Sequence, residues 1–313
     1  MASDLHVIVV PPHPAGSRAA AAAVRDVVDE LERLERCWSR FLPTSDISRI
    51  HRLGAAGGGA LTVDPSTLVL LASMLEGVHV TAGRFDPTVL RAVVAEGYDT
   101  SRVRPDDRCD LDPDAGLAAT IEALELDPST DTVVVPPGLA LDPGGIGKGL
   151  AADLAVLRLL ERGVAGALVG IGGDLAMAGT APDPAGWLVD VEHVDPRDGV
   201  LCSIAVSGGG VATSSTRSRR WWRDGGERHH QIDPRTSQCS TTDLDAVTVI
   251  APSGWLAEVH ATAALAVGSA RVRSYLDDHG LSGLAVRCGA TRDEVIATAD
   301  LRDVVLRTRS DAR

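Results

Sequence analysis

Aromatic residues and long apolar runs are both scarce in this sequence. Only 3% of its 313 residues are aromatic although 44% are hydrophobic, so the core must be built mainly from Ala, Val, Leu and Ile. No run reaches the roughly 18 apolar residues that a membrane-spanning helix requires. The first residues also lack the basic region of a signal peptide, and no nearby cysteine could carry a lipid. We therefore expect no transmembrane segment and a cytoplasmic protein, unless a leader has been removed.

Paired cysteines and surplus positive charge are missing as well. The five cysteines are odd in number, scattered and without a C-x-x-C pair, which argues against a disulfide framework or a structural zinc site. The formal net charge is −13, so the surface as a whole repels polyanions. Nucleic acid is therefore not expected as a partner.

Two common catalytic patterns are also absent. No Gly-x-Ser-x-Gly surrounds a serine, which argues against a Ser-His-Asp hydrolase. A Walker A loop is excluded, because Asp142 stands where its first glycine would be and Gly149 follows the lysine.

The apolar spacing that is present predicts helices mixed with strands. Helices are expected at 17–38, 66–82, 148–162 and 256–267, with a short one through Ile47 and Ile50. The residues of helix 148–162 expected to face the core are Leu150, Leu154, Leu157 and Leu160. Strands are expected at 5–10, 132–135, 139–141, 167–171, 187–191, 204–206, 247–250, 284–288 and 295–297. Because helices and strands do not alternate strictly, we predict an α+β fold. We also predict a single domain over 1–313 and a disordered tail at 307–313.

The segment Leu141-Asp-Pro-Gly-Gly-Ile-Gly-Lys-Gly149 is the most informative one. Its glycines allow the backbone to approach a ligand closely, and Lys148 supplies a point charge suited to a phosphate. A plain turn that opens a helix is the alternative interpretation. The segment therefore indicates a phosphorylated small molecule as ligand.

Three further places carry chemistry. Glu258 and Thr262 lie four residues apart on a predicted helix, so their oxygens share one face and could bind Mg²⁺; a dipole-favoured Glu and a back-bonded Thr are the alternative. His230 lies beside an acid and an arginine and could act as a general base; the end of a polar hairpin is the alternative. Asp86 precedes Pro87, and the proline restricts the backbone of Asp86 to an extended conformation. In this conformation the Asp86 carboxylate could point into a cleft; a turn in which Asp86 caps a helix is the alternative.

Several short motifs occur in one order between residues 36 and 268. They are Ser-Arg-Phe…Ser-Asp-Ile-Ser-Arg-Ile, Gly-Arg-Phe-Asp-Pro-Thr-Val, Leu-Asp-Pro-Gly-Gly-Ile-Gly-Lys-Gly…Asp, Gly-Ile-Gly-Gly-Asp, Ala-Thr-Ser-Ser, His-x-Ile-Asp-Pro-Arg-Thr, Val-Thr-Val-Ile-Ala and Ala-Glu-x-x-Ala-Thr-Ala. This ordered set resembles the ApbE family of FAD:protein FMN transferases. Each motif alone is weak, but the order makes the resemblance specific.

The resemblance implies a site assembled from these motifs, with the FAD cleft between two subdomains. It assigns FAD contacts to Phe41, Arg84, Phe85, Asp86, Asp142, Lys148 and Ile232. It assigns the metal to the backbone carbonyl of Gly145 and to Glu258 and Thr262, and catalysis to His230 as base together with Lys148. The chain departs from the family pattern where Glu258 replaces Asp, where Ser215 and Ser237 replace Gly, and where His51 replaces Asn. The N-terminal Met-Gly-Thr segment of the family is not recognisable either.

The activity implied is Mg²⁺-dependent transfer of the FMN half of FAD to a Ser or Thr hydroxyl of an acceptor protein, with release of AMP. Two alternatives remain open at this point. One is an FAD pyrophosphatase that yields free FMN and AMP. The other is a flavin-binding protein whose catalysis the departures have weakened.

Overall fold

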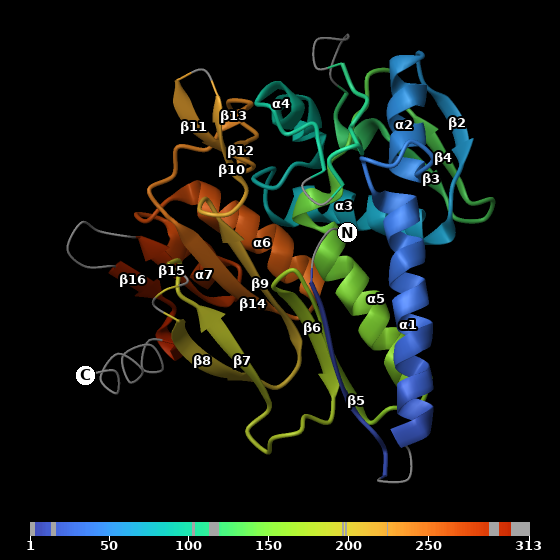
Figure 1. Ribbon diagram of the computed structural model, residues 1–313. Coiled ribbons are helices and arrows are strands. Elements are labelled where there is room, and N and C mark those ends of the chain that lie inside the picture. The colour runs from blue at the N-terminus through green and yellow to red at the C-terminus, as the bar shows by residue number, and fades with distance from the viewer. Residues whose placement is uncertain are drawn as a thin grey trace. The chain divides into compact units, whose positions relative to one another are not determined.

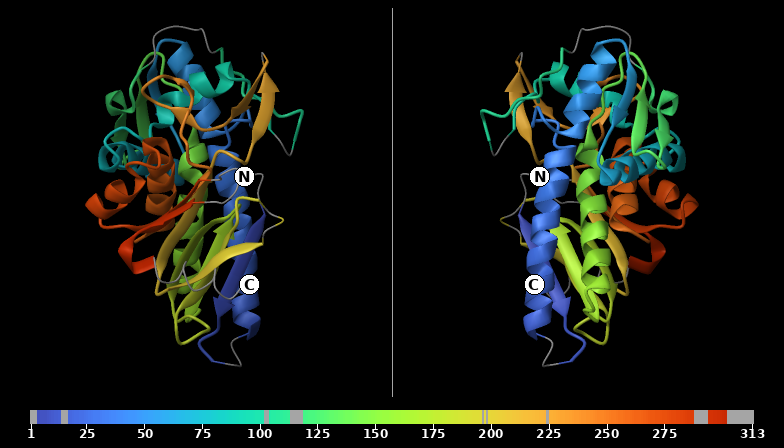
Figure 2. Two further views of the ribbon diagram at one scale, coloured as in Figure 1. Left: turned by 90° about the vertical axis from the view of Figure 1, so that its left-hand side faces the viewer. Right: turned by 90° about the vertical axis from the view of Figure 1, so that its right-hand side faces the viewer.

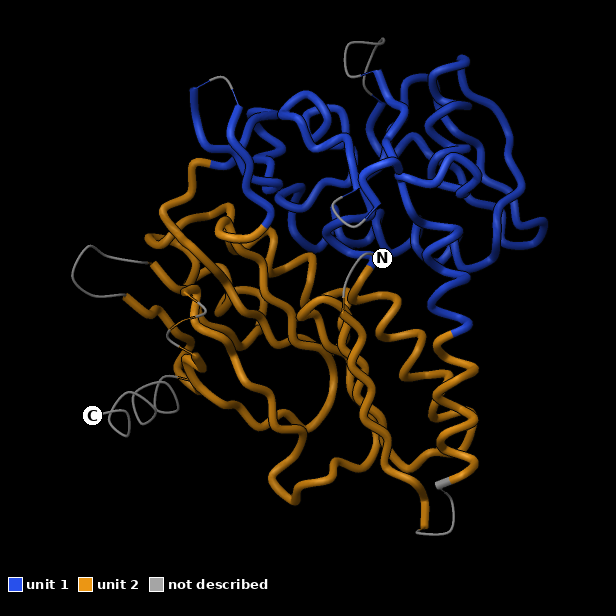
Figure 3. Tube along the Cα trace, viewed as in Figure 1, with its two compact units in different colours: residues 1–2, 29–147, 219–240 blue, residues 3–28, 148–218, 241–313 orange. Residues whose placement is uncertain are grey.

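The computed structural model describes residues 4–13, 17–101, 104–112, 119–195, 197, 199–223, 225–287 and 294–301. The chain forms two compact units (Figure 3), and each is described by itself. Unit 1 contains Asp29–Gly147 and Arg219–Ser240, and unit 2 contains Ser3–Val28, Lys148–Ser218 and Thr241–Arg313. The predicted tail at 307–313 lies outside the described residues.

A seven-stranded antiparallel sheet is the centre of unit 2 (Figure 1). Its strand order is β1-β5-β6-β9-β14-β15-β16, and every neighbouring pair is antiparallel. The strands are β1 (Leu5–Val10), β5 (Gly166–Ile171), β6 (Asp174–Gly179), β9 (Gly209–Ser215), β14 (Ala246–Ala251), β15 (Ser282–Arg287) and β16 (Glu294–Ala297).

The two faces of this sheet are covered by different elements, as Figure 2 shows. Side chains alternate along each strand, so Val211 and its neighbour Ala212 point to opposite faces. Val211 packs with the hairpin β7 (Trp187–Glu192) and β8 (Val200–Val206), whose Trp187 is fully buried. Ala212 packs with α6 (Gly254–Val267) and α7 (Val272–Asp278). The small residues of β9 and α6 allow the helix to lie close to the sheet.

Helix α5 (Gly147–Glu161) begins within the glycine–lysine loop, and from Lys148 onward it belongs to unit 2. Its buried face differs in part from the predicted one: Leu150 is buried, but Leu157 is 54% exposed. The correction follows from the alanines, since Ala151, Ala152 and Ala155 are buried and bring the helix close to its neighbours on that face.

Unit 1 combines short helices with small sheets. Its helices are the end of α1 (Ser17–Trp38, which starts in unit 2), α2 (Asp46–Ala55), α3 (Pro65–Val80), α4 (Leu90–Ala95) and the 3₁₀ turns η2 (Pro87–Val89), η3 (Ile121–Ala123) and η4 (Pro143–Gly145). Its strands are β2 (Gly59–Thr62), β3 (Glu125–Asp127) and β4 (Thr132–Val135), and the hairpins β10 (Arg220–Arg223) with β11 (Gly226–His229) and β12 (Ile232–Asp233) with β13 (Gln238–Cys239).

Most predicted elements are confirmed, and one strand is wrong. The helix at 17–38 has the predicted bounds, and the mixed α+β class holds. Residues 139–141 form no strand, because β4 pairs with β2 and β3 and leaves this segment as a buried loop. In the described ranges the cysteines are free, and none of the helices has the length and apolarity needed to cross a membrane.

Candidate functional site

Three charged side chains of unit 2 meet where α5, β6 and α6 begin. The ammonium of Lys148 donates hydrogen bonds to Asp174 Oδ2 and to Glu258 Oε1. Both carboxylates are buried, and the Lys148 side chain is 16% exposed. The structure thus brings together Lys148 and Glu258, two predicted site residues that lie 110 positions apart in the sequence.

Backbone N–H groups fix the second oxygen of each carboxylate. Gly149 donates to Glu258 Oε2 over 2.8 Å, and Thr213 donates to Asp174 Oδ1 over 3.3 Å. Each acid therefore has one oxygen on the backbone and the other on the lysine. Charge-assisted hydrogen bonds of this kind orient a carboxylate more firmly than an ion pair alone.

The third predicted residue of this unit, Thr262, lies one turn after Glu258 on α6. Its hydroxyl is 3.1 Å from Ser214 Oγ, which belongs to the hydroxyl-rich end of β9. Thr262 is only partly buried. The same helical face therefore carries one carboxylate and one hydroxyl, as the spacing predicted.

The cluster holds one more negative charge than positive charge. Burial disfavours the ammonium, but the carboxylates of Asp174 and Glu258 outweigh this and hold the pKa of Lys148 above its ordinary value. Burial raises the pKa of Glu258; Lys148 opposes this shift, and the charge of Asp174 adds to it. A further cation beside Glu258 would offset the cost of keeping both acids ionised away from water.

The donor set suits a hard divalent cation. A buried carboxylate and a hydroxyl on one helical face are oxygen ligands, and few protein oxygens are typical of Mg²⁺, which keeps several waters or phosphate oxygens. In the part of the chain that the structure describes, no three or more His, Cys, Asp or Glu gather as a metal cluster. The predicted contact from the Gly145 carbonyl belongs to unit 1 and stays a prediction.

Helices α5 and α6 are locked together beside this cluster. Asp153 of α5 accepts hydrogen bonds from the backbone N–H groups of Gly254 (2.7 Å) and Trp255 (2.9 Å), so it caps the N-terminus of α6. A Cβ on Gly149 would lie 2.4 Å from Gly254 O, which leaves no room for any side chain there. This close crossing sets where Glu258 can reach.

In unit 1, three of the predicted FAD-contact segments converge. Asp142 caps η4 by accepting from Gly144 N–H, and its carboxylate pairs with the buried Arg40, whose Nε lies 3.5 Å from Asp142 Oδ1. The backbone N–H of Asp142 donates to Pro87 O over 2.7 Å. The segments carrying Phe41, Asp86 and Asp142 are therefore adjacent, as a common ligand site requires.

The predicted residues around Asp86 occupy distinct environments. Asp86 has the extended backbone that Pro87 imposes and caps η2, because its Oδ1 accepts from the N–H and hydroxyl of Thr88. The interpretation of Asp86 as a cap is thus confirmed, and its contact with a ligand stays a prediction. Phe85 is buried, with 3% exposed, while Arg84 is half-buried.

Phe41 is the first of a series of aromatic side chains that lie next to one another. The Arg40 guanidinium lies over the Phe41 ring at 4.3 Å and over the Tyr98 ring at 4.8 Å, and Tyr98 in turn lies 5.7 Å from the Trp221 ring. Tyr98 and Trp221 are not among the predicted site residues, because neither lies in one of the ordered motifs.

His230 and Ile232 follow strand β11 directly. The imidazole of His230 has Nε2 3.2 Å from the amide nitrogen of Gln231 and is half-buried. Ile232 is buried and pairs with Cys239 in the β12–β13 hairpin. The neighbouring His229 is held to Ser240 O at 3.1 Å, and burial lowers its pKa. His229 is thus fixed to the backbone, while His230 has an amide side chain as its neighbour.

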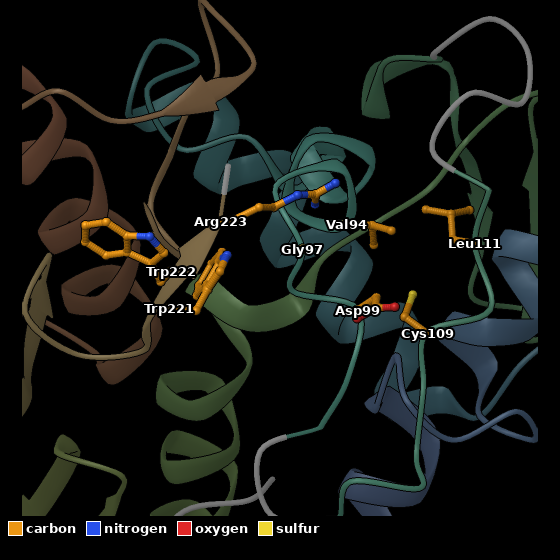
Figure 4. A pocket seen from close by; sticks show the side chains of 8 residues that line it. All are labelled: Val94, Gly97, Asp99, Cys109, Leu111, Trp221, Trp222 and Arg223. Atoms are coloured by element: carbon orange, nitrogen blue, oxygen red, sulfur yellow. The ribbon is translucent and has the colours of Figure 1, made fainter. Parts of the chain in front are cut away.

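Unit 1 also contains a cavity of about 550 Å³ (Figure 4). It is lined by Val94, Gly97, Asp99, Cys109, Leu111, Trp221, Trp222 and Arg223. None of the predicted site residues lines it, although Trp221, which lies beside Tyr98, does.

Asp174 is the residue that sequence reasoning missed. It ends the Gly-Ile-Gly-Gly-Asp motif, and Gly172 and Gly173 before it adopt left-handed backbone (φ 58° and 92°). This glycine turn is the sequence feature that could have pointed to Asp174, since two such glycines place the next residue at the end of a strand. The motif did not reveal its partner, Lys148.

Comparison with known proteins shows the family of this chain. The model of the ApbE family matches residues 1–285, so the chain belongs to the ApbE family. A protein of Treponema pallidum (strain Nichols) named FAD:protein FMN transferase is 30% identical over 274 residues, which is 80% of this chain and 74% of that protein. One of the same name from Klebsiella pneumoniae (strain 342) is 30% identical over 147 residues, and the match spans 42% of its length and 47% of this chain.

Solved structures show the same fold. The ApbE protein of Thermotoga maritima superposes with a TM-score of 0.78 at 23% identity and 96% coverage of both chains. The flavinyl transferase ApbE of Pseudomonas stutzeri, in its apo form, gives 0.74 at 23% identity and 97% coverage of both chains. The predicted ApbE-like α+β fold is confirmed.

Proposed function

We propose that this protein is an Mg²⁺-dependent FAD:protein FMN transferase that attaches FMN to a Ser or Thr hydroxyl of an acceptor protein and releases AMP. Membership of the ApbE family and the names of its relatives support the class of reaction. The observation that carries the proposal is the contact of Lys148 with Glu258, because it joins the predicted phosphate and metal residues in one cluster.

Phosphoryl-type transfer requires mainly positioning and neutralisation of charge. In the proposed step, the acceptor oxygen bonds to the FMN phosphorus while the bond from that phosphorus to the bridging oxygen breaks, and AMP leaves with that oxygen. Lys148 would stabilise the negative charge that develops on the diphosphate. His230 would accept the proton of the acceptor hydroxyl.

Glu258 and Thr262 would hold the divalent cation, with the Gly145 carbonyl as a further predicted contact. When bound, the cation supplies positive charge to the diphosphate and the departing AMP. Phe41, Arg84, Phe85, Asp86, Asp142 and Ile232 would contact FAD, and the adjacency of the Phe41, Asp86 and Asp142 segments supports this part of the proposal.

Mass spectrometry after reaction tests the proposal. The protein is incubated with FAD, Mg²⁺ and a peptide that carries a Ser/Thr flavinylation motif, and AMP is measured in parallel. A peptide that gains the mass of FMN with matching AMP supports transfer. Free FMN with AMP would instead indicate a pyrophosphatase, and bound FAD without AMP would indicate a flavin-binding protein.

Two variants assign the roles. Lys148→Ala and His230→Ala should each lower turnover by about 10²-fold or more, as expected for loss of a charge stabiliser or a general base. Arg158→Ala is the matched control on α5, because Arg158 is exposed and, among the described residues, forms an ion pair with the exposed Glu161 at 3.3 Å. Unchanged turnover in a folded Lys148→Ala protein would overturn the role of the lysine.

A further inference from the structure

Lys148 and the proposed cation share one carboxylate. Glu258 Oε1 accepts from the Lys148 ammonium, while Glu258 is also the only carboxylate among the predicted metal residues. Two positive charges close to one carboxylate oxygen repel each other strongly when the site is buried. The lysine therefore needs a second anionic partner if Glu258 is to serve a cation.

Asp174 has the properties of that partner. It is 3% exposed, and it stands at the first position of β6, after a turn of two glycines with left-handed backbone. Its Oδ1 accepts from Thr213 N–H on the neighbouring strand β9, which leaves Oδ2 directed to the ammonium. An acid built into the edge of a strand pair moves little, so it can anchor a flexible lysine.

We propose that Asp174 is a positioning residue that retains the Lys148 ammonium while Glu258 binds the divalent cation. This inference rests on the proposed function. Asp174 itself touches neither FAD nor the cation in this account; it acts through Lys148. Without Asp174, Lys148 has Glu258 as its remaining carboxylate in the cluster, and lysine and cation then compete for it.

A double-mutant cycle on cation binding tests the proposal without FAD or acceptor. Mn²⁺ is titrated into the full chain and followed by electron paramagnetic resonance of the free ion, with Mg²⁺ competition as confirmation. The four proteins are the parent, Asp174→Asn, Lys148→Met and the double variant. Circular dichroism and thermal unfolding establish that each is folded; if Lys148→Met does not fold, Lys148→Gln replaces it, because its amide can still donate to a carboxylate.

We expect the loss of Mn²⁺ affinity in Asp174→Asn to depend on the presence of Lys148. Asp174→Asn should weaken Mn²⁺ binding in both backgrounds, and the factor of weakening should be about tenfold or more larger with Lys148 present than with Lys148→Met. Removing Asp174 lowers cation affinity a little in both backgrounds through its charge, so the difference between the two is the informative quantity.

Other outcomes overturn the proposal in distinct ways. An equal loss in both backgrounds would mean that Asp174 acts on the cation directly, as a ligand or as a charge. No loss in either would mean that Asp174 has no role in the site. If the parent binds no Mn²⁺, or if Glu258→Gln binds it unchanged, the metal assignment of the proposed function fails as well.

Turnover supplies a second readout for the positioning role. With Mg²⁺ saturating, Asp174→Asn should lower kcat for FMN transfer, because the ammonium is no longer held at the diphosphate, and Asp174→Glu should restore part of it. A defect that saturating Mg²⁺ abolishes entirely would show that Asp174 affects only the cation, contrary to the proposal.

Discussion

Gly149 and Gly254 meet backbone to backbone where α5 crosses α6. A Cβ on Gly149 would lie 2.4 Å from Gly254 O and 2.8 Å from Trp255 N. The backbone N–H of Gly149 also donates a hydrogen bond to Glu258. The lack of space requires glycine at position 149, and the backbone N–H of the same residue holds Glu258. Gly149 links the packing of two helices to the position of a predicted metal ligand.

Gly149→Ala should destabilise the protein by about 1–3 kcal/mol, as expected for overpacking between rigid backbones. The measurement is the free energy of unfolding from urea denaturation. Gly147→Ala, in the same helical turn, is the control: its Cβ would meet only Pro143 Cβ at 3.5 Å, an ordinary contact. Equal effects of the two substitutions would contradict the close crossing.

Asp153→Ala should cost about 1–2 kcal/mol of unfolding free energy, because it removes the cap from two N–H groups at the start of α6. Asp153→Asn should cost less, since one amide oxygen can still accept a hydrogen bond. Thermal and urea unfolding measure both variants.

Ser253 provides the matched control for this cap. It occupies the N-cap position of α6, but in the described structure its hydroxyl makes no capping hydrogen bond. Ser253→Ala should therefore change stability by less than about 0.5 kcal/mol. A larger loss from Ser253→Ala than from Asp153→Ala would show that the helix is capped locally and not from α5.

His51 should make the protein sensitive to mild acid. Its Nε2 lies 2.9 Å from Leu141 O and 3.1 Å from Leu141 N, and burial above all lowers the pKa of His51 from 6.5 to about 4. Between these values the unfolded chain binds more protons than the folded one. Stability is therefore complete above pH 6.5 and declines as the pH falls towards 4, by at most about 1.4 kcal/mol per pH unit.

His51→Gln tests this assignment, because the amide reaches towards Leu141 without titrating. The free energy of unfolding is measured from about pH 7.5 to about pH 4.5. The variant should show a shallower decline, and the contribution of His260, whose pKa is also about 4, cancels in the comparison. Parallel curves would contradict the role of His51.

Ser237→Gly should leave stability unchanged or raise it by up to about 1 kcal/mol. Ser237 has φ 54°, a left-handed conformation that costs a non-glycine residue about 1–2 kcal/mol, and the greater freedom of glycine in the unfolded chain offsets part of the gain. Thr236→Gly is the control; Thr236 is exposed and is not among the described residues of positive φ, so the same substitution should destabilise. Differential scanning calorimetry compares the two.

Strong local patterns were recoverable from the sequence, and weak ones were not. The amphipathic helix at 17–38 was predicted with its bounds because its apolar spacing is regular. Strand β6 and strand β9 were missed, since Ala176 and Gly210 dilute the β-branched pattern that marks a strand. Leu157 was placed on the wrong face, because alanines can form a buried face as well as leucines do.

The sequence by itself determined the kinds of chemistry available: a glycine–lysine loop, and a carboxylate and a hydroxyl one helical turn apart. Only the tertiary structure decided that Lys148 has two carboxylate partners, that one of them is Asp174, and that α6 is capped from α5 by Asp153. The reason is physical. Periodicity and capping act over a few neighbouring residues, whereas these partners come from segments that the sheet and the helix crossing bring together, and no local pattern carries that information.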